Sequence, residues 1–600
     1  MKIFWAFFSV LFSSFVSGQI NTGERAKWFV NDRFGMFIHW GIYSSAEGVW
    51  KGEKLRNNNE YAEWIQYRNR ISKEEYLSLL DSFDWESINP EEWVLLAKES
   101  GMKYVTLTAK HHDGFALWNS KSSDYNIYSQ ITQRRDIVKE LSEACQKHGM
   151  KLGLYYSHWI DWEHPKSWDH TKELSGLDLK LFDEYWQEKV IPQMTELLTN
   201  YGDIGMIWFD MWIHHSKTVV SKEQLFQLKN LIRELQPNCL INSRLGLSIE
   251  EDKDVDYRTL GDNQLGKEKL NYPWQTPATV AHSWGFNAQD SKWKSTTTIL
   301  KSLVGNVSLN GNLMLNIGPR ANGGLPFELK SRLKEIGQWL EINGNSIYGS
   351  GAFDLKTNLH DWGTITYKEK KPNIHKTYLH VFNWPLNNEL KVTGIHNRPN
   401  KIYFLSDLSK NSLSFKHENV LTKIKLPNNL INKYISVIVM EFDEKPRALK
   451  GLVAENAVGG YSLNLENFIY TNGDGIVKKS TRHGTIPKNM EVKKFQEIKW
   501  KIYVDEPDTY LFDTSYSYQN NKEGGKMEII IKGNSLKHSF KPTCKTIGEP
   551  LQDWIIDNYK SNRVGSVEIT EKGIYEITVK LEAEKQNPIK WQWLWIDSKN

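Results

Sequence analysis

The sequence has little cysteine. Its 600 residues include only Cys145, Cys239 and Cys544, which lie far apart and lack the spacing of a metal site. Three cysteines allow at most one disulfide, so the chain is not a small scaffold held together by disulfides. We expect three buried thiols in a protein whose core is large enough to fold without covalent links.

Charge of one sign is also scarce. The 76 basic and 72 acidic residues leave a formal net charge of +4, which argues against a basic nucleic-acid-binding surface or an acidic tail. Beyond the N-terminus no apolar run reaches about 18 residues, so we expect no internal membrane span. Hydrophobic residues make up 40% of the chain and charged residues 25%, which predicts a globular protein rather than a disordered one.

The first 18 residues have the pattern of a targeting segment. Lys2 precedes an apolar run over residues 3–16, and the small residues Ser17 and Gly18 follow. The run is too short to span a membrane, and its flanks fit a cleavage site. We therefore predict a signal peptide over residues 1–18, a mature chain that begins near Gln19, and export to the periplasm or the medium.

Aromatic residues are abundant, with 25 Trp and 26 Tyr. The flat face of an aromatic ring stacks on the C–H groups of a sugar, while the polar edge of Trp or Tyr can still hydrogen-bond. A Trp-rich hydrophobic core explains the same composition, and composition alone leaves both interpretations open.

Residues 19–350 alternate between strand-like and helix-like stretches. The continuous apolar character of several strand candidates is typical of parallel strands that are buried on both faces. We predict an α/β fold, a (β/α)₈-like (TIM) barrel. The expected strands are 33–41, 104–113, 151–157, 205–210, 239–244, 255–260, 279–285 and 313–318, and the clearest helices are 89–101, 136–149, 184–202 and 221–237. The first three of these helices end in glycine, a helix-stop signal.

After residue 350 the pattern changes to short alternating segments, which predict antiparallel strands. We expect two β-sandwich domains, over residues 351–445 and 446–600. Acidic turns precede two of the later strands, as in some carbohydrate-binding sandwiches. A purely stabilising role explains these domains equally well.

Polar clusters follow five of the predicted barrel strands. Because the active site of such a barrel lies at the carboxyl ends of its strands, these clusters should meet on one face. A single polar residue at a strand end is ordinary, but five together predict a functional site. They are His39-Trp40-Gly41, Lys110-His111-His112-Asp113-Gly114, Tyr155-Tyr156-Ser157-His158, Trp208-Phe209-Asp210 and Asn242-Ser243-Arg244.

Asp210 ends the apolar run GMIWFD, and alternation places it on the same strand face as Met206 and Trp208. A carboxylate beside an indole suits attack on a sugar, and glycosidases pair such a group with a second carboxyl. Arg244 is expected to bind a sugar hydroxyl or to pair with Asp210. Adjacent His111 and His112 on a regular strand would point to opposite faces, so we expect contacts to sugar hydroxyls rather than a metal site.

The sequence resembles the α-L-fucosidases of glycoside hydrolase family 29. The resemblance covers about residues 24–350, continues loosely beyond them, and is far more specific than one short motif. Its strings are WFVNDRFGMFIHWGIYS, NEYAEWIQYR, AKHHDGFALWNSKSSDYN, DIVKELSEACQKHGMKLGLYYSHWIDW, IGMIWFDMW, NSRLG, SWGFN and NLMLNIGPRANGGLP.

The resemblance implies a barrel followed by a β-sandwich, and a retaining hydrolase that needs neither metal nor cofactor. It implies a fucosylated oligosaccharide or polysaccharide as the substrate. It assigns the nucleophile to Asp210. It also assigns sugar contacts to His39, Glu63, Trp64, His111, His112, Tyr155, Trp208 and Arg244.

The sequence departs from the family pattern at the acid/base. Many members have a glutamate at the end of a D-[FY]-x-T-x-E stretch, whereas this chain has Gly261 there and Asp262 next. A second family glutamate, in a W-E string, is replaced by Gln275. We therefore predict Asp262 as the acid/base, with a raised pKa. Glu47 and Glu53, in the first long loop, are the outside candidates.

Two other functions stay open. One hydroxyl separates L-fucose from L-galactose, and an apolar pocket rejects an added hydroxyl only modestly, so a related L-sugar such as an α-L-galactoside is an alternative substrate. A sugar-binding protein that has lost its acid/base is the other, with Gly261 and Gln275 as the traces of that loss. The presence of Asp210 together with the pocket residues argues against this second reading.

Overall fold

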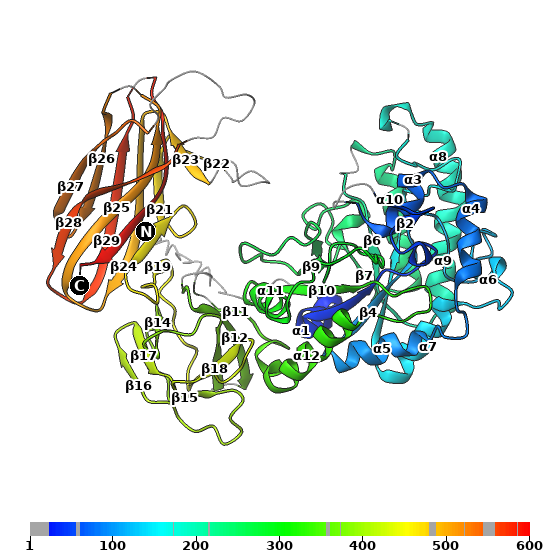
Figure 1. Ribbon diagram of the computed structural model, residues 1–600, viewed down its shortest axis with the longest axis horizontal. Helices are drawn as coiled ribbons and strands as arrows, with labels where there is room; N and C mark the ends of the chain where they lie inside the picture. The colour runs from blue at the N-terminus through cyan, green and yellow to red at the C-terminus, as the bar shows by residue number, and fades with distance from the viewer. Residues whose placement is uncertain are drawn as a thin grey trace, which may run out of the picture. The chain divides into compact units, whose positions relative to one another are not determined.

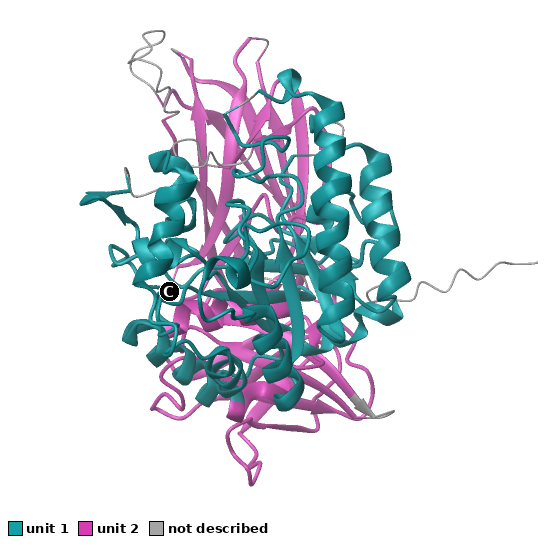
Figure 2. Cartoon of the chain, turned by 90° about the vertical axis from the view of Figure 1, so that its right-hand side faces the viewer, with its two compact units in different colours: residues 1–295, 309–340 teal, residues 296–308, 341–600 magenta. Residues whose placement is uncertain are grey.

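The computed structural model describes residues 23–599 except 56–59, 172, 214–216, 354, 356–359, 372–373, 479–487, 521, 544–557 and 585. The chain forms two compact units (Figure 2). The first comprises Met1–Ser295 and Leu309–Leu340, and the second Thr296–Ser308 and Glu341–Asn600. This grouping divides the chain at residue 340 and gives two units rather than three parts. The predicted domain boundaries at residues 350 and 445 therefore stay predictions.

The first unit is built on an eight-stranded parallel sheet, which bears out the (β/α)₈-like fold (Figure 1). The order along the sheet is β7-β6-β5-β4-β1-β10-β9-β8. The bounds are β1 Phe34–Ile38, β4 Tyr104–Lys110, β5 Lys151–Tyr156, β6 Ile204–Phe209, β7 Leu240–Ile241, β8 Arg258–Thr259, β9 Trp274–Ala278 and β10 Gly311–Ile317. A single parallel bridge, between Asn242 and Tyr257, joins the two end strands.

Helices connect most of these strands and cover their outer face, and α5 packs beside α7 (Figure 1). Side chains cap several of them in the expected way: Asn89 caps α5, Asp136 caps α7, and Ser221 with Gln224 forms a capping box on α10. The longer helices are α5 Pro90–Glu99, α7 Ile137–His148, α8 Leu179–Tyr185, α9 Ile191–Asn200, α10 Lys222–Leu235, α11 Thr296–Ser308 and α12 Phe327–Asn343.

Short elements complete the first unit. They are α1 Lys27–Asp32, α2 Tyr43–Ala46, β2 Val49–Trp50, β3 Glu53–Lys54, α3 Ile65–Asn69, α4 Lys73–Ser78 and α6 Ile127–Gln130. The 3₁₀ turns Ala62–Trp64 and Ser243–Leu245 carry predicted site residues.

Two predicted elements are wrong in detail. The seventh strand is β9, not residues 279–285, and Pro277 concealed it because a proline inside a strand reads as a break. The neighbouring strand β8 pairs only with Trp274 and Gln275 of β9. At Pro277, therefore, β9 has no strand partner on that side. The single helix expected over 184–202 is divided by a π-helical turn, Trp186–Val190, just before Pro192.

The inside of the barrel is filled with aromatic and sulfur-containing side chains. Phe37, Tyr104, Tyr155, Trp208 and Met314, each from a different strand, are almost completely buried in one cluster. Much of the tryptophan and tyrosine content therefore serves as core, and the same column of rings extends up to the carboxyl ends of the strands.

The second unit contains two antiparallel sandwiches. In the first, the sheet β11-β12-β13-β18-β15 faces the sheet β14-β17-β16. Side chains from both sheets, among them Ile365, Leu379, Leu390 and Ile424, form a common buried core. The strands are β11 Gly351–Ala352, β12 Gly363–Lys371, β13 Ile374–Val381, β14 Glu389–Thr393, β15 Lys401–Phe404, β16 Phe415–Glu418, β17 Leu421–Lys425 and β18 Ser436–Phe442.

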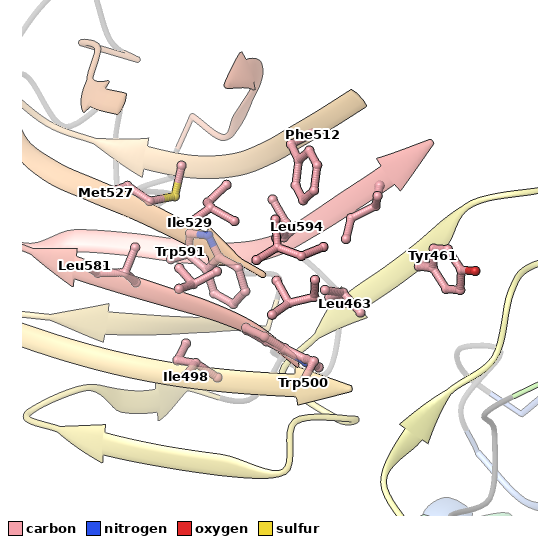
Figure 3. Packing of buried hydrophobic residues seen from close by; sticks show 14 of the residues in the cluster. Tyr461, Leu463, Ile498, Trp500, Phe512, Met527, Ile529, Leu581, Trp591 and Leu594 are labelled. Carbon is pink, nitrogen blue, oxygen red and sulfur yellow. The ribbon is translucent and has the colours of Figure 1, made fainter. Parts of the chain in front are cut away.

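The second sandwich packs two larger sheets around a core that includes Trp500 and Trp591 (Figure 3). One sheet orders its strands β19-β24-β29-β26-β27 and adds β21, and the other orders them β22-β23-β30-β25-β28 and adds β20. Strand bounds are β19 Leu452–Val453, β20 Tyr461–Asn464, β21 Tyr470–Gly473, β22 Ile476–Lys478, β23 Asn489–Val492, β24 Phe495–Val504, β25 Asp508–Tyr518, β26 Gly524–Ile531, β27 Asn534–Phe540, β28 Lys560–Ile569, β29 Gly573–Glu582 and β30 Ile589–Ser598.

Three sequence predictions concern the signal peptide, internal membrane spans and the thiols. The predicted signal peptide lies outside the described residues, so export stays a prediction. Within the described part of the chain, no helix combines the length and apolarity needed to cross a bilayer. Cys145 and Cys239 are buried free thiols, and Cys544 lies outside the described residues.

Trp591→Ala tests the core of the second sandwich. The indole is fully buried and donates to Thr514 Oγ1 at 2.9 Å, so truncation should lower the free energy of unfolding of this unit by about 3–5 kcal/mol. Urea unfolding monitored by tryptophan fluorescence would measure the loss. Trp595→Ala on the same strand is the control, because its side chain is 46% exposed and should cost far less. Equal losses in the two variants would contradict this account of the core.

Candidate active site

Asp210 lies directly after β6, at the carboxyl end of the barrel, and is held at both oxygens. Its Oδ1 accepts a hydrogen bond from Arg244 Nη1 at 2.7 Å, and its Oδ2 accepts one from the Tyr155 hydroxyl at 3.1 Å. Its main-chain carbonyl accepts from the Trp159 indole at 3.1 Å. The carboxylate is therefore fixed in place, with 16% of its side chain exposed.

Arg244 joins the two predicted catalytic carboxylates. Its Nη2 donates to Asp262 Oδ1 at 2.5 Å and to the Leu260 carbonyl at 2.9 Å, while Nη1 binds Asp210. The guanidinium also lies over the Trp208 ring, 5.0 Å from its centroid. Of the two alternatives for Arg244, pairing with Asp210 is the one that the structure shows. The residue sits on a 3₁₀ turn rather than on a strand, because β7 ends at Ile241.

Asp262 is the more accessible of the two carboxyl groups, with 41% of its side chain exposed. Partial burial raises its pKa, Arg244 opposes that rise, and the charge of Asp210 adds to it. The net direction is upward, as predicted for a group that must carry a proton. No described contact joins Glu47 or Glu53 to Asp210, Arg244 or Asp262.

His39 follows β1 and presents a single defined nitrogen to the site. The Asn316 amide donates to the Trp284 carbonyl at 2.7 Å, so its Oδ1 faces His39 Nδ1, also at 2.7 Å. Burial lowers the pKa of His39 to about 4, and the ring is neutral at physiological pH. Nδ1 therefore carries the proton, and Nε2 is left as a hydrogen-bond acceptor.

His112 is also a neutral ring that carries its proton on Nδ1, but a different residue fixes this tautomer. Ser157 Oγ donates to the Ile160 carbonyl at 2.8 Å and so accepts from His112 Nδ1 at 2.7 Å. Burial, reinforced by the charge of His170 and then Lys110, holds the pKa of His112 well below its usual range. Its Nε2 is therefore an acceptor, 3.6 Å from Asp210 Oδ2. Two acceptors side by side suit a hydroxyl donor such as that of a sugar.

The expectation that His111 and His112 point to opposite faces is wrong. Strand β4 ends at Lys110, so both histidines lie on the turn beyond it and their ring centroids are 4.5 Å apart. His111 stacks on Tyr155, at 5.4 Å and 11°. The alternation rule fails here because it holds only within a strand.

Aromatic rings form the walls around these groups. Tyr155 stacks on Trp208 at 5.6 Å, and Trp64 lies edge-on to His112 at 5.5 Å. The Trp208 indole donates to Gln275 Oε1 at 3.0 Å. Gln275 thus occupies the barrel interior as a neutral partner of Trp208, and its replacement of a family glutamate leaves no unpaired charge there.

Glu63 is a buried carboxyl on the turn Ala62–Trp64. Its Oε2 accepts from the Gly285 N–H at 2.9 Å. Burial raises its pKa to about 8, hydrogen bonds from the main chain oppose this, and the charge of Asp262 adds to it. A carboxyl that keeps its proton near neutral pH can donate to a sugar oxygen, which a carboxylate cannot do.

A buried ionic cluster lies beneath the two histidines. Asp161 Oδ2 accepts from Lys189 at 2.6 Å and from Lys110 at 3.2 Å, and all three side chains are almost fully buried. Burial alone would raise the pKa of Asp161, but the two lysines hold it well below its usual range. Trp162 N–H donates to the His112 carbonyl at 2.8 Å. The cluster therefore ties the histidine turn to the segment after β5.

All ten predicted site residues lie at this end of the barrel, yet the roles of several supporting residues were missed. Asn316 and Ser157 set the histidine tautomers, and Asp161 with Lys189 supports the turn that carries His112. Asn316 and Ser157 lie in strings that marked the family, but nothing local signals their partners. Among the described residues, no group of three His, Cys, Asp or Glu side chains could hold a metal ion.

The model of the family described as Alpha-L-fucosidase matches residues 17–345. The chain belongs to this family. It is 30% identical over 385 residues to the alpha-L-fucosidase of Dictyostelium discoideum, an alignment that covers 59% of this chain and 80% of that protein. It is 28% identical over 401 residues to the plasma alpha-L-fucosidase of Homo sapiens, covering 62% of this chain and 79% of that protein.

Solved α-L-fucosidases share the fold. The enzyme from Vibrio sp. strain EJY3 superposes with a TM-score of 0.74 at 26% identity, covering 96% of this chain and 98% of that one. A family 29 enzyme from Bacteroides thetaiotaomicron, solved as a trapped covalent intermediate, gives a TM-score of 0.62 at 26% identity over 72% of this chain and 98% of that one. The chain is thus a glycoside hydrolase of the α-L-fucosidase family.

Asp161→Asn tests the support beneath the histidines. It leaves Lys110 and Lys189 buried without a counter-charge, so it should lower the free energy of unfolding by about 3–5 kcal/mol and reduce activity. Glu188→Gln is the control, because Glu188 pairs with Lys166 at 2.9 Å but is 59% exposed, and should cost at most about 1 kcal/mol. Urea unfolding and fucosidase assays on both variants measure the difference. Similar small effects would show that the cluster does not hold the site.

Proposed function

We propose that the chain is a retaining exo-glycosidase that releases terminal α-L-fucose from oligosaccharides or polysaccharides. The observation that carries the proposal is the placement of Asp210 and Asp262 on one guanidinium, that of Arg244. Retaining glycosidases use two carboxyl groups, one as nucleophile and one as acid/base. The Bacteroides thetaiotaomicron relative, trapped as a covalent intermediate with 2-fluoro-fucosyl fluoride, supports the same chemistry for this chain.

The surroundings of the two carboxyl groups assign their roles. Asp210 receives hydrogen bonds from Arg244 and Tyr155 on different oxygens, which suits a group that works as a carboxylate nucleophile. Asp262 is more exposed and its pKa is raised, first by partial burial, which suits a group that delivers a proton. A pair in which one carboxyl group has a raised pKa is typical of the acid and nucleophile of glycosidases.

In the first step, an oxygen of Asp210 bonds to the anomeric carbon and the bond from that carbon to the leaving oxygen breaks. The proton of Asp262 passes to the leaving oxygen. The products of this step are an alcohol, a fucosyl ester on Asp210 and an ionised Asp262. Arg244, bound to both carboxyl groups, offsets the negative charge that moves from one to the other.

In the second step, Asp262 takes a proton from water as the water oxygen bonds to the anomeric carbon. The ester bond to Asp210 breaks, which releases fucose and restores both carboxyl groups. Two displacements at the same carbon return the original configuration.

The remaining residues recognise the sugar. Nε2 of His39 and Nε2 of His112 accept hydrogen bonds from sugar hydroxyls, while protonated Glu63 donates one to a sugar oxygen. Trp64 supplies a ring for the apolar side of the pyranose, while Tyr155 and Trp208, which stack on each other and are almost fully buried, form the floor of the pocket. This combination of fixed acceptors, one neutral carboxyl donor and aromatic walls selects among sugars by the arrangement of their hydroxyls.

The function is tested by release of 4-nitrophenol from its α-L-fucoside, with azide added to two variants. Asp210→Gly should lose at least about 10³-fold in kcat, and azide should give β-L-fucosyl azide. Asp262→Gly with azide should give the α-anomer instead, because the fucosyl ester still forms and azide replaces water. Near-native activity of Asp210→Gly, or the same anomer from both variants, would overturn these roles.

The corresponding α-L-galactoside provides the comparison for the sugar. We expect wild type to prefer the fucoside, and faster turnover of the galactoside would favour the L-galactosidase alternative.

The pH profile of kcat/KM should identify the acid. The first step needs protonated Asp262, so activity should fall as pH rises through the raised pKa of this group. Asp262→Asn should lose this basic limb when it is compared with wild type on the 4-nitrophenyl fucoside. Asp32→Asn is the control, because burial also raises the pKa of Asp32, which pairs with Lys151 at the opposite end of the barrel strands. An unchanged limb in Asp262→Asn would exclude it as the acid.

A further inference from the structure

Asp262 lies in a segment that is fastened along the edge of β9. Asn263 N–H donates to the Pro277 carbonyl at 2.9 Å, and Leu260 N–H to the Gln275 carbonyl at 2.9 Å. The hydroxyl of Thr276 donates to the Gln264 carbonyl at 2.7 Å. The segment is rich in Gly, Asn and Gln, and its main chain has hydrogen-bond partners on both sides of Asp262.

The side chain of Asn263 provides the fastening next to the acid. Asn263 adopts a left-handed conformation, with φ of 58°, and its Oδ1 accepts from Thr279 N–H at 2.9 Å. The same oxygen accepts from Lys294 Nζ at 2.6 Å. A residue held in this conformation by defined hydrogen bonds turns the chain at a fixed angle, and Asp262 immediately precedes it.

Lys294 is itself held firmly. Its ammonium donates to the Thr279 carbonyl at 2.6 Å as well as to Asn263. Its N–H donates to the Val280 carbonyl at 2.8 Å, and its own carbonyl accepts from Arg332 Nε at 2.7 Å. Within the described residues no carboxylate lies within ion-pair distance of it. A partly buried lysine whose ammonium donates hydrogen bonds to oxygens of two neighbouring segments acts as a cross-link between them.

We propose that Lys294 is a positioning residue for the acid/base, which acts by holding Asn263 and with it the main chain that carries Asp262. Arg244 holds the side chain of Asp262 by a hydrogen bond, and Lys294, through Asn263, holds the main chain next to Asp262. The inference rests on the proposed function, because it requires that Asp262 is the acid/base.

The test varies the leaving group. Poor leaving groups need the proton and good ones do not, so loss of acid placement slows phenyl α-L-fucoside much more than the 2,4-dinitrophenyl compound. Lys294→Met should lower kcat/KM for the phenyl substrate by about tenfold, a part of the 10²–10⁴-fold that a general acid supplies, and leave the dinitrophenyl substrate within about twofold. Lys292→Met, an exposed lysine on the same loop, should change neither.

Parallel measurements separate the possible failures. A uniform loss on both substrates, or no loss, would show that Lys294 is merely structural or irrelevant, and would overturn the proposal while leaving the function intact. Asp262→Asn should steepen the leaving-group dependence more than Lys294→Met does. If Asp262→Asn does not steepen it, the acid assignment fails, and the role of Lys294 fails with it. Lys294→Gln, which keeps one N–H donor, should give an intermediate effect, and serves as the second variant if Lys294→Met does not fold.

Discussion

One guanidinium sets the arrangement of the catalytic end of the barrel. Arg244 donates to Asp210, to Asp262 and to the Leu260 carbonyl, and it stacks over Trp208. A buried cation is stable only when its donors are used, and this one connects the segments after β6, β7 and β8. Asp210 and Asp262, the proposed nucleophile and acid, thus share one partner, so a shift of either carboxyl group changes the electric field at the other.

The rest of the pocket follows a different electrostatic rule, in which the groups proposed to bind the sugar are themselves neutral. His39, His111 and His112 are neutral because burial lowers their pKa values, and Glu63 is neutral because burial raises its own. The charges that are present lie in paired clusters, such as Asp161 with its two lysines. Neutral groups with fixed tautomers discriminate hydroxyls by hydrogen-bond direction, which a bare charge cannot do.

The sequence was sufficient for the features that depend on local pattern. Apolar runs located seven of the eight barrel strands, and polar residues at strand ends located the site. The remaining strand, β9, was misplaced because it contains Pro277. A proline is tolerated there because the short neighbouring strand β8 does not extend far enough to pair with it, and the local sequence does not reveal that pairing. The support from Asn316, Ser157 and Lys189 was missed for the same reason, because each acts through a partner far away in the chain.

The strands that carry the site differ in length, so the residues of the site are held in place in two different ways. Asp210 follows the six-residue β6, which is paired on both sides, whereas Arg244 and Asp262 follow the two-residue strands β7 and β8 at the seam of the barrel. The position of Asp210, the proposed nucleophile, is therefore set by main-chain pairing, which tolerates little change. Asp262, the proposed proton donor, follows a strand of only two paired residues, so its position depends on hydrogen bonds to Arg244 and to the edge of β9, and it can change without disturbing the sheet that carries Asp210.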